Sequence, residues 1–259
     1  MANITYPYIK NYLIRDFIIT YQVNMAEAIQ TQAEDYSCFN TFFIRKLKPE
    51  CRPLSPEDIV SPVDGCISEM GHIHHGTIIQ AKGKDYSVQA LLAGEKSTSD
   101  SFANGLFATI YLSPKDYHRV HMPIDGTLTR MIHVPGRLFS VQPHTVNTIP
   151  GLFSRNERLV AFFDTAIGPM AMVLVGATLV GAIGTTWHGD LRRSSKIQQI
   201  DVPTDPAYSL KKGQEMGYFK LGSTVILLFA NATKMQWIEE LKSGECLTYG
   251  SAMASLRTL

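Results

Sequence analysis

The sequence predicts an α+β fold, with N-terminal helices followed by a β-rich domain of barrel-like or sandwich-like sheets. From residue 59 onward, short β-branched runs alternate with Gly, Pro and Asp turns, which is typical of strands. Before that point, apolar residues recur at the spacing of a helix face. The 259 residues, 45% of them hydrophobic and 18% charged, suffice for a large core. We therefore expect a helical segment at residues 1–50 and a β-rich domain at residues 51–259.

The helical segment is predicted to begin with a long helix at residues 8–34, followed by a short one at residues 37–47. The apolar face of the long helix contains Ile14, Phe17, Ile18, Tyr21 and Met25. Two interpretations of this face remain open. Either it packs against its own domain, or it rests among lipid headgroups at a membrane surface. The second is weakened because only Lys10 and Arg15 supply positive charge.

The expected strands are seven apolar runs separated by turns. They are CISEM, HGTIIQA, LFATIYL, GTLTRMIHV, LVAFFDT, AMVLVGATLV and TVILLF. A weak helical pattern follows at residues 235–241. The longest apolar stretch, residues 170–183, is shorter than the roughly 20 residues of a membrane-spanning helix and is rich in Val and Gly, which favours buried strands.

Charge and cysteine content exclude some classes of protein. With 24 basic and 23 acidic residues and no basic block, a nucleic-acid partner is not expected. The four cysteines form no CxxC pair, so a structural zinc site has no support. No secretory signal pattern precedes them, so free thiols in a reducing cytoplasm are expected. These cysteines are Cys38, Cys51, Cys66 and Cys246.

Two short motifs contain groups suited to acid–base chemistry. SPVDG places Asp64 in a turn before a strand, although alone it resembles an ordinary Asp-Gly turn. DYHRVHMP contains His118 and His121, which titrate near neutrality and suit proton transfer. A zinc site is the alternative, but it needs a third ligand. The possible donors, His72, His74 and His75, lie in a polar loop-like stretch without ligand spacing and are interpreted as surface residues.

A third motif, LGST, precedes the last expected strand. Alone it is a Gly-Ser turn, but another chemistry is open to it. The Ser223 hydroxyl can attack the Gly222 carbonyl, because glycine leaves the carbonyl carbon unshielded. Such a step needs a base for the hydroxyl proton and a donor for the oxyanion.

Together, SPVDG, DYHRVHMP and LGST resemble the phosphatidylserine decarboxylase family, and the resemblance extends through FNTFFIRKLKPECRPL and VPGRLFSV over nearly the whole chain. It implies that Asp64, His121 and Ser223 form a triad for self-cleavage between Gly222 and Ser223. Residues 1–222 would become a large chain and residues 223–259 a small one, paired as a heterodimer, with further dimerisation left open. Ser223 would become a covalent pyruvoyl group (pyruvate as cofactor, no metal).

The resemblance also implies the reaction and its setting. Residues 51–259 would be the catalytic domain, in which phosphatidylserine forms a Schiff base with the pyruvoyl group and loses CO2 to give phosphatidylethanolamine. His118 would donate a proton to the carbanion, and Ser140 would face the substrate carboxylate. The substrate places the protein at a membrane surface, peripherally on the cytoplasmic side, with residues 1–50 as the membrane-associating part. The candidate phosphate ligands are Arg119, Arg155 and Arg158, although a solvated surface position is the favoured interpretation for any one of them.

Three rival functions remain open at this point. They are a catalytically silent lipid-binding relative, a zinc hydrolase that uses the two histidines, and a pyridoxal-dependent decarboxylase. The last would need a Schiff-base lysine, for which the sequence gives no context.

Overall fold

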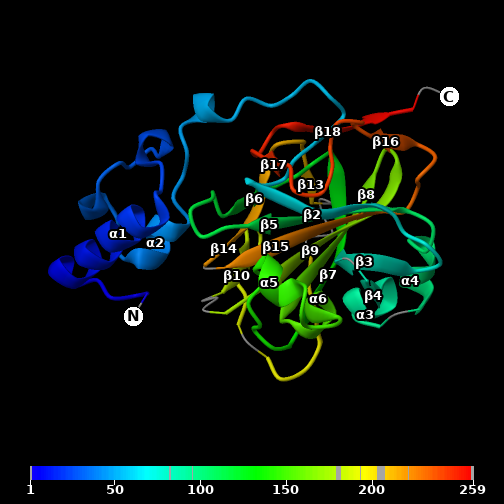
Figure 1. Ribbon diagram of the computed structural model, residues 1–259, viewed down its shortest axis with the longest axis horizontal. Helices are drawn as coiled ribbons and strands as arrows, with labels where there is room; N and C mark the ends of the chain where they lie inside the picture. The colour runs from blue at the N-terminus through cyan, green and yellow to red at the C-terminus, as the bar shows by residue number, and fades with distance from the viewer. Residues whose placement is uncertain are drawn as a thin grey trace.

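The computed structural model describes residues 2–81, 83–94, 96–178, 182–192, 194–202, 208–220 and 222–257. Helices α1 (Pro7–Tyr21) and α2 (Phe39–Phe43) lie together at one end, and the sheets form the main body (Figure 1). The β-rich α+β prediction is confirmed. No helix among these described residues is long and apolar enough to cross a membrane.

The main sheet is antiparallel and has β15 near its centre (Figure 1). β15 pairs along all seven of its residues with β5 on one side and β9 on the other, and every residue in it is buried. The strand order is β12 (Gln198–Ile200), β7 (Gly126–Val134), β8 (Arg158–Thr165), β9 (Gly168–Gly176), β15 (Ser223–Phe229), β5 (Leu106–Leu112), β2 (Gly65–His72) and β17 (Cys246–Leu247), with β13 (Ser209–Leu210) also paired to β7.

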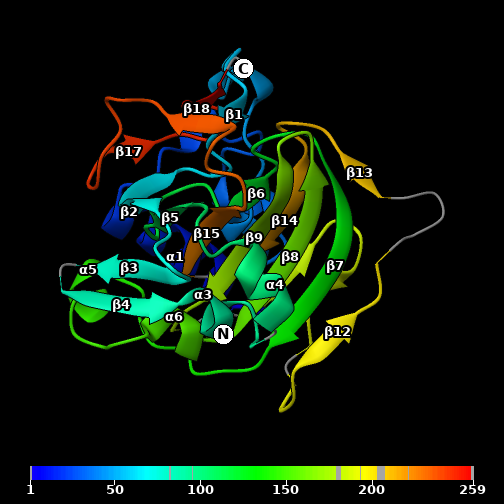
Figure 2. The same cartoon turned by 90° about the vertical axis from the view of Figure 1, so that its right-hand side faces the viewer.

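Three smaller sheets and several short helices surround this sheet. Figure 2 shows the β3–β4 hairpin and the short helices α3, α4 and α6 on one side of strands β7, β8 and β9. The four-stranded sheet is β11 (Gly189–Asp190), β10 (Ile183–Thr185), β14 (Glu215–Phe219) and β6 (Arg119–His121). The three-stranded sheet is β1 (Ile59–Val60), β18 (Ala252–Leu256) and β16 (Met235–Trp237). The remaining elements are β3 (Thr77–Ala81), β4 (Lys84–Ser87), α3 (Val88–Leu91), α4 (Lys96–Ser101), α5 (Pro143–Val146), α6 (Leu152–Arg155) and three 3₁₀ turns at Met25–Glu27, Ala33–Asp35 and Pro49–Cys51.

The core explains why the central strands have continuous apolar sequences. Strands β8, β9 and β15 are buried on both faces, so they lack the alternation of polar and apolar residues that a half-exposed strand shows. A second, smaller apolar cluster holds the N-terminal helices together. Its buried members are Ile14, Val23, Ala33, Tyr36 and Phe42.

The predicted strands are confirmed as β2, β3, β5, β7, β8, β9 and β15. The run AMVLVGATLV forms β9 only as far as Gly176, and Leu179 and Val180 lie outside the described residues. The pattern at residues 235–241 was wrongly interpreted as helical. Residues 235–237 form β16, in which buried Met235 alternates with exposed Gln236 and the strand pairs with β18.

The predicted helix at residues 8–34 is wrong beyond Tyr21. Gln22 adopts a left-handed conformation with a φ of 54°, and its N–H caps the carbonyls of Ile18 and Ile19. The chain then reverses, so Val23 joins the cluster around Ile14 from a loop and Ala33 joins it from a 3₁₀ turn. The second predicted helix, at residues 37–47, is limited to Phe39–Phe43.

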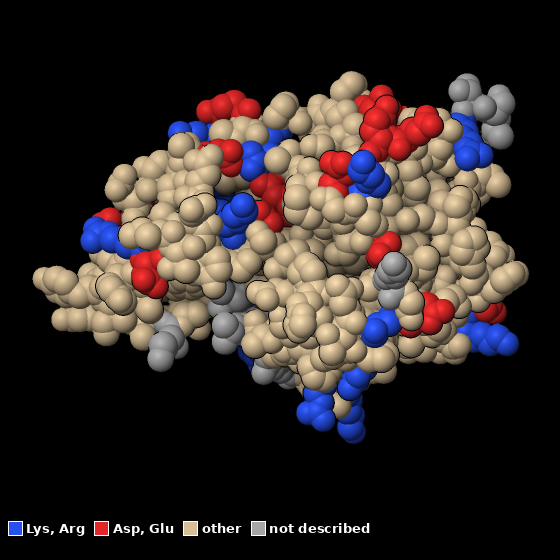
Figure 3. Space-filling view, in the orientation of Figure 1, with Lys and Arg blue, Asp and Glu red and all other residues tan. Residues whose placement is uncertain are grey.

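Charged side chains of both signs are interspersed on the face shown in Figure 3, and the end of the molecule formed by α1 has large uncharged areas. This mixture agrees with the near-zero net charge of +1.

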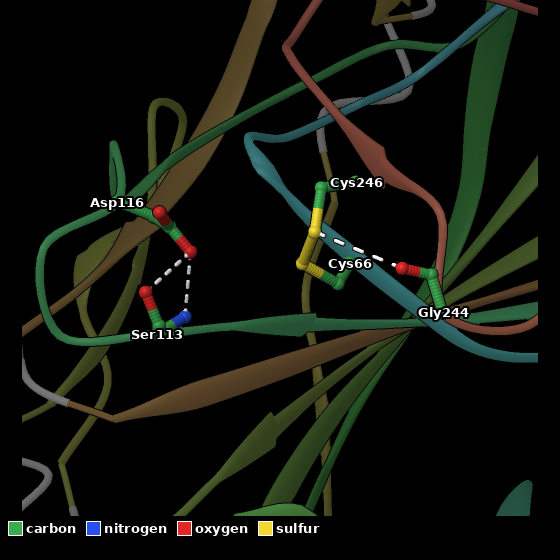
Figure 4. The surroundings of a disulfide bond; sticks show 5 residues. All are labelled: Cys66, Ser113, Asp116, Gly244 and Cys246. Carbon is green, nitrogen blue, oxygen red and sulfur yellow. Dashed lines mark hydrogen bonds between the residues drawn. A yellow bond between two sulfur atoms is a disulfide. The ribbon is translucent and has the colours of Figure 1, made fainter.

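The expectation of four free cysteines is wrong for one pair. Cys66 and Cys246 form a disulfide (Figure 4), and only Cys38 and Cys51 are free. The two partners lie 180 positions apart in sequence, yet β2 and β17 place them directly opposite each other. Their spacing in the sequence therefore gave no sign of the bond.

Candidate active site

The Gly222–Ser223 peptide lies where the central strand begins. Ser223 is the first residue of β15 and is fully buried, and its Oγ has no hydrogen-bond partner among the described residues. Gly222 has a φ of +52°, and a Cβ there would lie 3.3 Å from the Thr178 carbonyl oxygen. Both its conformation and its surroundings therefore favour glycine. Leu221, which precedes it in the LGST motif, lies outside the described residues.

A cavity of about 280 Å³ borders this peptide and is lined by both Gly222 and Ser140. The sequence-predicted Ser140 is thus brought to the same space as the predicted cleavage site. Its Oγ accepts a hydrogen bond from the Gln142 N–H at 3.3 Å. The other walls are mostly apolar and come from α1, α2, the end of β5 and three loops. These wall residues are Phe17, Tyr21, Phe43, Tyr111, Leu112, Pro114, Val141, Gln142, Ala177 and Thr178.

His118 is fully buried, and its ring lies 4.2 Å from that of Phe43, a residue of the cavity wall. Its Nδ1 is 2.8 Å from the Asp116 carbonyl oxygen. A carbonyl only accepts, so Nδ1 carries the proton and Nε2 has a free lone pair. Nε2 has no hydrogen-bond partner among the described residues. Burial lowers the pKa of His118 to about 3, so the ring is neutral.

The turn before His118 is fixed by Asp116. The Ser113 N–H and hydroxyl both donate to Asp116 Oδ2, at 2.7 and 2.8 Å (Figure 4). This turn follows β5, whose last residue, Leu112, lies opposite Ser223 in the main sheet. It therefore connects the strand beside the cleavage site to the histidine motif.

His121 is held on both ring nitrogens and on one face. Its Nδ1 donates to the Gly213 carbonyl at 2.9 Å, and its Nε2 accepts from the Tyr117 hydroxyl at 3.1 Å. The ring stacks on Tyr249 with a centroid distance of 3.8 Å. Burial lowers the pKa of His121, while the Gly213 carbonyl, Glu215 and Asp64 oppose that shift. The donating Nδ1 leaves the acceptor lone pair of the ring on Nε2.

Asp64 is buried and paired with Arg52. The guanidinium donates from Nε to Oδ1 at 3.0 Å and from Nη2 to Oδ2 at 2.6 Å. Hydrogen bonding to Asp64 raises the pKa of Arg52 further above its usual value. Arg52 also bonds Glu27 at 2.8 Å. The direct Asp64–His121 hydrogen bond of a simple triad is not present, because Arg52 and a backbone N–H hold the carboxylate and a backbone carbonyl accepts from the imidazole.

Tyr249 connects Asp64 with His121 instead. Its backbone N–H donates to Asp64 Oδ1 at 2.7 Å, and its ring stacks on His121. Its hydroxyl donates at 2.7 Å to the Gly213 carbonyl, the same oxygen that accepts from His121. Sequence reasoning missed both Tyr249 and Arg52. No motif marks Tyr249, and only the position of Arg52 in the family-like segment ECRPL could have drawn attention to it.

The three candidate phosphate-binding arginines differ in their burial and in their hydrogen-bond partners. Arg158 is buried and donates to the carbonyls of Leu91, Ala90, Ser154 and Asn156, which makes it a structural residue. Arg119 pairs with Glu215 at 2.6 Å. Arg155 is exposed, and its guanidinium carbon lies 5.0 Å from the centre of the Phe139 ring. Phe139 directly precedes Ser140 in the sequence. Of the three, Arg155 alone combines an exposed position with the loop that carries Ser140.

The zinc interpretation finds no support in the part of the chain that the structure describes. There, no group of three or more His, Cys, Asp or Glu residues is arranged to hold a metal ion. The polar partners of His118 and His121 are backbone carbonyls and a tyrosine.

Comparison with known proteins agrees with this geometry. A family model described as phosphatidylserine decarboxylase matches residues 39–255. A phosphatidylserine decarboxylase proenzyme of Legionella pneumophila (strain Corby) is 58% identical over 254 residues, covering 98% of this chain and 90% of the relative. Proteins of the same name from Idiomarina loihiensis and Hahella chejuensis are 51% and 47% identical, covering 94% and 99% of this chain and 85% and 87% of the relatives. The chain therefore belongs to the phosphatidylserine decarboxylase family.

Proposed function

We propose that this protein is a self-processing carboxy-lyase that converts phosphatidylserine into phosphatidylethanolamine and CO2. The observation that carries the proposal is the Gly222–Ser223 peptide, in which a buried serine hydroxyl with no hydrogen-bond partner among the described residues follows a glycine that lines a cavity. Relatives over nearly the full chain are named as proenzymes, which supports processing of this chain as well.

Self-cleavage would start with the Ser223 hydroxyl. Its oxygen adds to the Gly222 carbonyl carbon, and the peptide C–N bond breaks to leave an ester. Removal of the Cα proton of residue 223 then breaks the Cβ–Oγ bond, so that Gly222 ends as a carboxylate. Water converts the remaining dehydroalanine into a ketone and releases ammonia. The product is a small chain of residues 223–259 capped by a pyruvoyl group.

We assign His121 as the base and Asp64 as the charge that supports it. His121 has its acceptor lone pair on Nε2, and Asp64 favours the protonated ring electrostatically. The Tyr117 hydroxyl donates its hydrogen bond to that lone pair. For His121 to act as the base, this hydrogen bond must break, or Tyr117 must relay the proton from Ser223 to His121. Tyr249 and Arg52 would act as positioning residues for this pair.

The residues around position 223 fit a pyruvoyl group. The group replaces a side chain that has no hydrogen-bond partner among the described residues and sits beside a mostly apolar cavity. When present, it supplies an electron sink for the carbanion that decarboxylation leaves. Ser140 would bind the substrate carboxylate. His118 would take up a proton at Nε2 once the anionic substrate raises its pKa, and deliver that proton to the carbanion.

We further propose that residues 1–50 associate peripherally with the cytoplasmic surface of the cell membrane and that residues 51–259 carry the catalysis. Three exposed side chains of α1, Tyr8, Tyr12 and Ile19, are each more than two-thirds exposed. The same helix contributes Phe17 and Tyr21 to the cavity wall. A lipid held against α1 would thus have its headgroup close to Gly222. The large and small chains would remain together, because β15 is buried between two neighbours.

The test is Ser223→Ala with Ser255→Ala as a matched control. Ser255 is a half-buried serine of β18, in the same small chain and away from the cavity. Wild type and control should show two chains by intact mass, the smaller one blocked and reactive toward hydroxylamine. Ser223→Ala should remain a single chain and release no CO2 from phosphatidylserine. Wild-type protein that stays whole and still decarboxylates the lipid would contradict the proposal, and one that stays whole without activity would indicate a silent lipid-binding relative.

A further inference from the structure

We propose that the Cys66–Cys246 disulfide is a covalent tether that keeps the small chain attached to the large chain after self-cleavage. This inference rests on the proposed cleavage between Gly222 and Ser223. That site lies between the two cysteines in sequence, so scission places Cys66 on the large chain and Cys246 on the small one. The bond, shown in Figure 4, would then be an interchain link.

The bond lies where two strands of different chain origin meet. β2 and β17 are antiparallel, and Cys66 and Cys246 face each other with Cα atoms 3.9 Å apart. The Ile67 N–H donates to the Glu245 carbonyl at 2.8 Å, and the Gly244 N–H donates to the Ile67 carbonyl at 2.8 Å. Directly opposite residues of an antiparallel pair bring their side chains together across the two strands, which places the two sulfur atoms within bonding reach.

The tether acts at a short edge strand of the small chain. β15 is held on both sides over seven residues, whereas β17 is a two-residue strand at the edge of the same sheet. Such a short edge pair is weak by itself.

The disulfide joins the same two segments that meet at the candidate active site. Cys66 follows Asp64 by two residues, and Cys246 precedes Tyr249 by three. The Tyr249 N–H donates to the Asp64 carboxylate at 2.7 Å. The tether therefore spans the junction through which the small chain contacts Asp64 and His121.

Forming the bond requires an oxidant. The two thiols lose two protons and two electrons, and a small-molecule or protein disulfide accepts them and becomes two thiols. Cys246 is exposed and Cys66 is partly exposed, so exchange with such a partner is sterically open. Cys51 is also partly exposed but is free, which makes it a matched control.

The experiment compares wild type, Cys246→Ser and Cys51→Ser after blocking free thiols with iodoacetamide before denaturation. Each protein is analysed by gel and intact mass with and without dithiothreitol. Wild type and Cys51→Ser should migrate as one linked species without reductant and as two chains with it. Cys246→Ser should give two chains under both conditions.

The outcomes separate the two proposals. Wild type that gives two chains without reductant overturns the tether and leaves the cleavage proposal intact. Wild type that gives one chain even with reductant overturns cleavage, and the tether with it. Linked wild type combined with a linked Cys246→Ser variant also overturns the assignment of the bond to this pair.

Discussion

Replacing Arg52 with Met tests how strongly the fold depends on the Asp64 ion pair. The side chains of Arg52 and Asp64 are only 11% and 10% exposed. Removing the guanidinium would leave Asp64 with the Tyr249 N–H as its hydrogen-bond donor. Breaking a buried ion pair costs about 3–5 kcal/mol. We expect the lower end, about 3 kcal/mol, because that donor remains, which corresponds to a fall of roughly 6–12 °C in Tm for a chain of this size.

The measurement is urea and thermal unfolding followed by circular dichroism. It is done in a Ser223→Ala background, so that a single uncleaved chain unfolds. The matched control is Arg15→Met, because Arg15 pairs with Glu34 while their side chains are 62% and 47% exposed. That surface pair should contribute less than about 1 kcal/mol.

Two results would refute this reasoning. The first is an Arg52→Met variant that loses no more stability than Arg15→Met. The second concerns the double variant Arg52→Met/Asp64→Asn, in which the stranded charge is removed. It should be more stable than Arg52→Met alone, and an equal or lower stability would show that the charge is not the cause.

Three further predictions concern the histidines and the cavity. Burial lowers the pKa of His118 to about 3 from its ordinary 6.5. Between these two pH values the unfolded chain binds a proton at this residue and the folded chain does not. The free energy of unfolding therefore falls on acidification by up to about 1.4 kcal/mol per pH unit. His118→Gln should flatten that fall in urea unfolding at pH 7, 6 and 5, and unchanged slopes would contradict it. Ser140→Ala should cleave itself normally yet lose about 10- to 100-fold in kcat/KM for decarboxylation, the cost of one hydrogen bond to a charged group. An unchanged kcat/KM would remove Ser140 from substrate binding. Tyr249→Phe loses only the hydrogen bond to the Gly213 carbonyl and should slow self-cleavage about 2- to 10-fold. Tyr249→Ala also loses the stacking on His121 and should slow self-cleavage more. Cleavage of both variants at the wild-type rate would show that Tyr249 does not position His121.

Local sequence signals predicted the strands better than the helices. The strand runs are bracketed by turn residues, so their bounds could be read directly. The helix predicted at residues 8–34 failed because apolar residues continue past Gln22 although the chain reverses there. Met25, which continues the helical spacing in the sequence, packs on the same cluster from a 3₁₀ turn that follows the reversal.

The site was predictable motif by motif but not as an assembly. Asp64, His118, His121, Ser140 and Ser223 each lie in a recognisable motif, and the structure brings Ser140 and Gly222 to one cavity. The contacts that hold these residues are long-range. Tyr249 and Asp64 are 185 positions apart, and Cys66 and Cys246 are 180 apart. No spacing within a single sequence encodes such pairs.

The central position of β15 implies that folding precedes the proposed self-cleavage. Its first residue, Ser223, pairs with β5 on one side and β9 on the other, so the surroundings in which we propose that Ser223 reacts exist only after strands from residues 106 to 229 have assembled. If the proposed cleavage is correct, a chain that misfolds would not form the pyruvoyl carbonyl. Maturation of this kind reports on correct folding, because only a correctly assembled precursor becomes a catalyst.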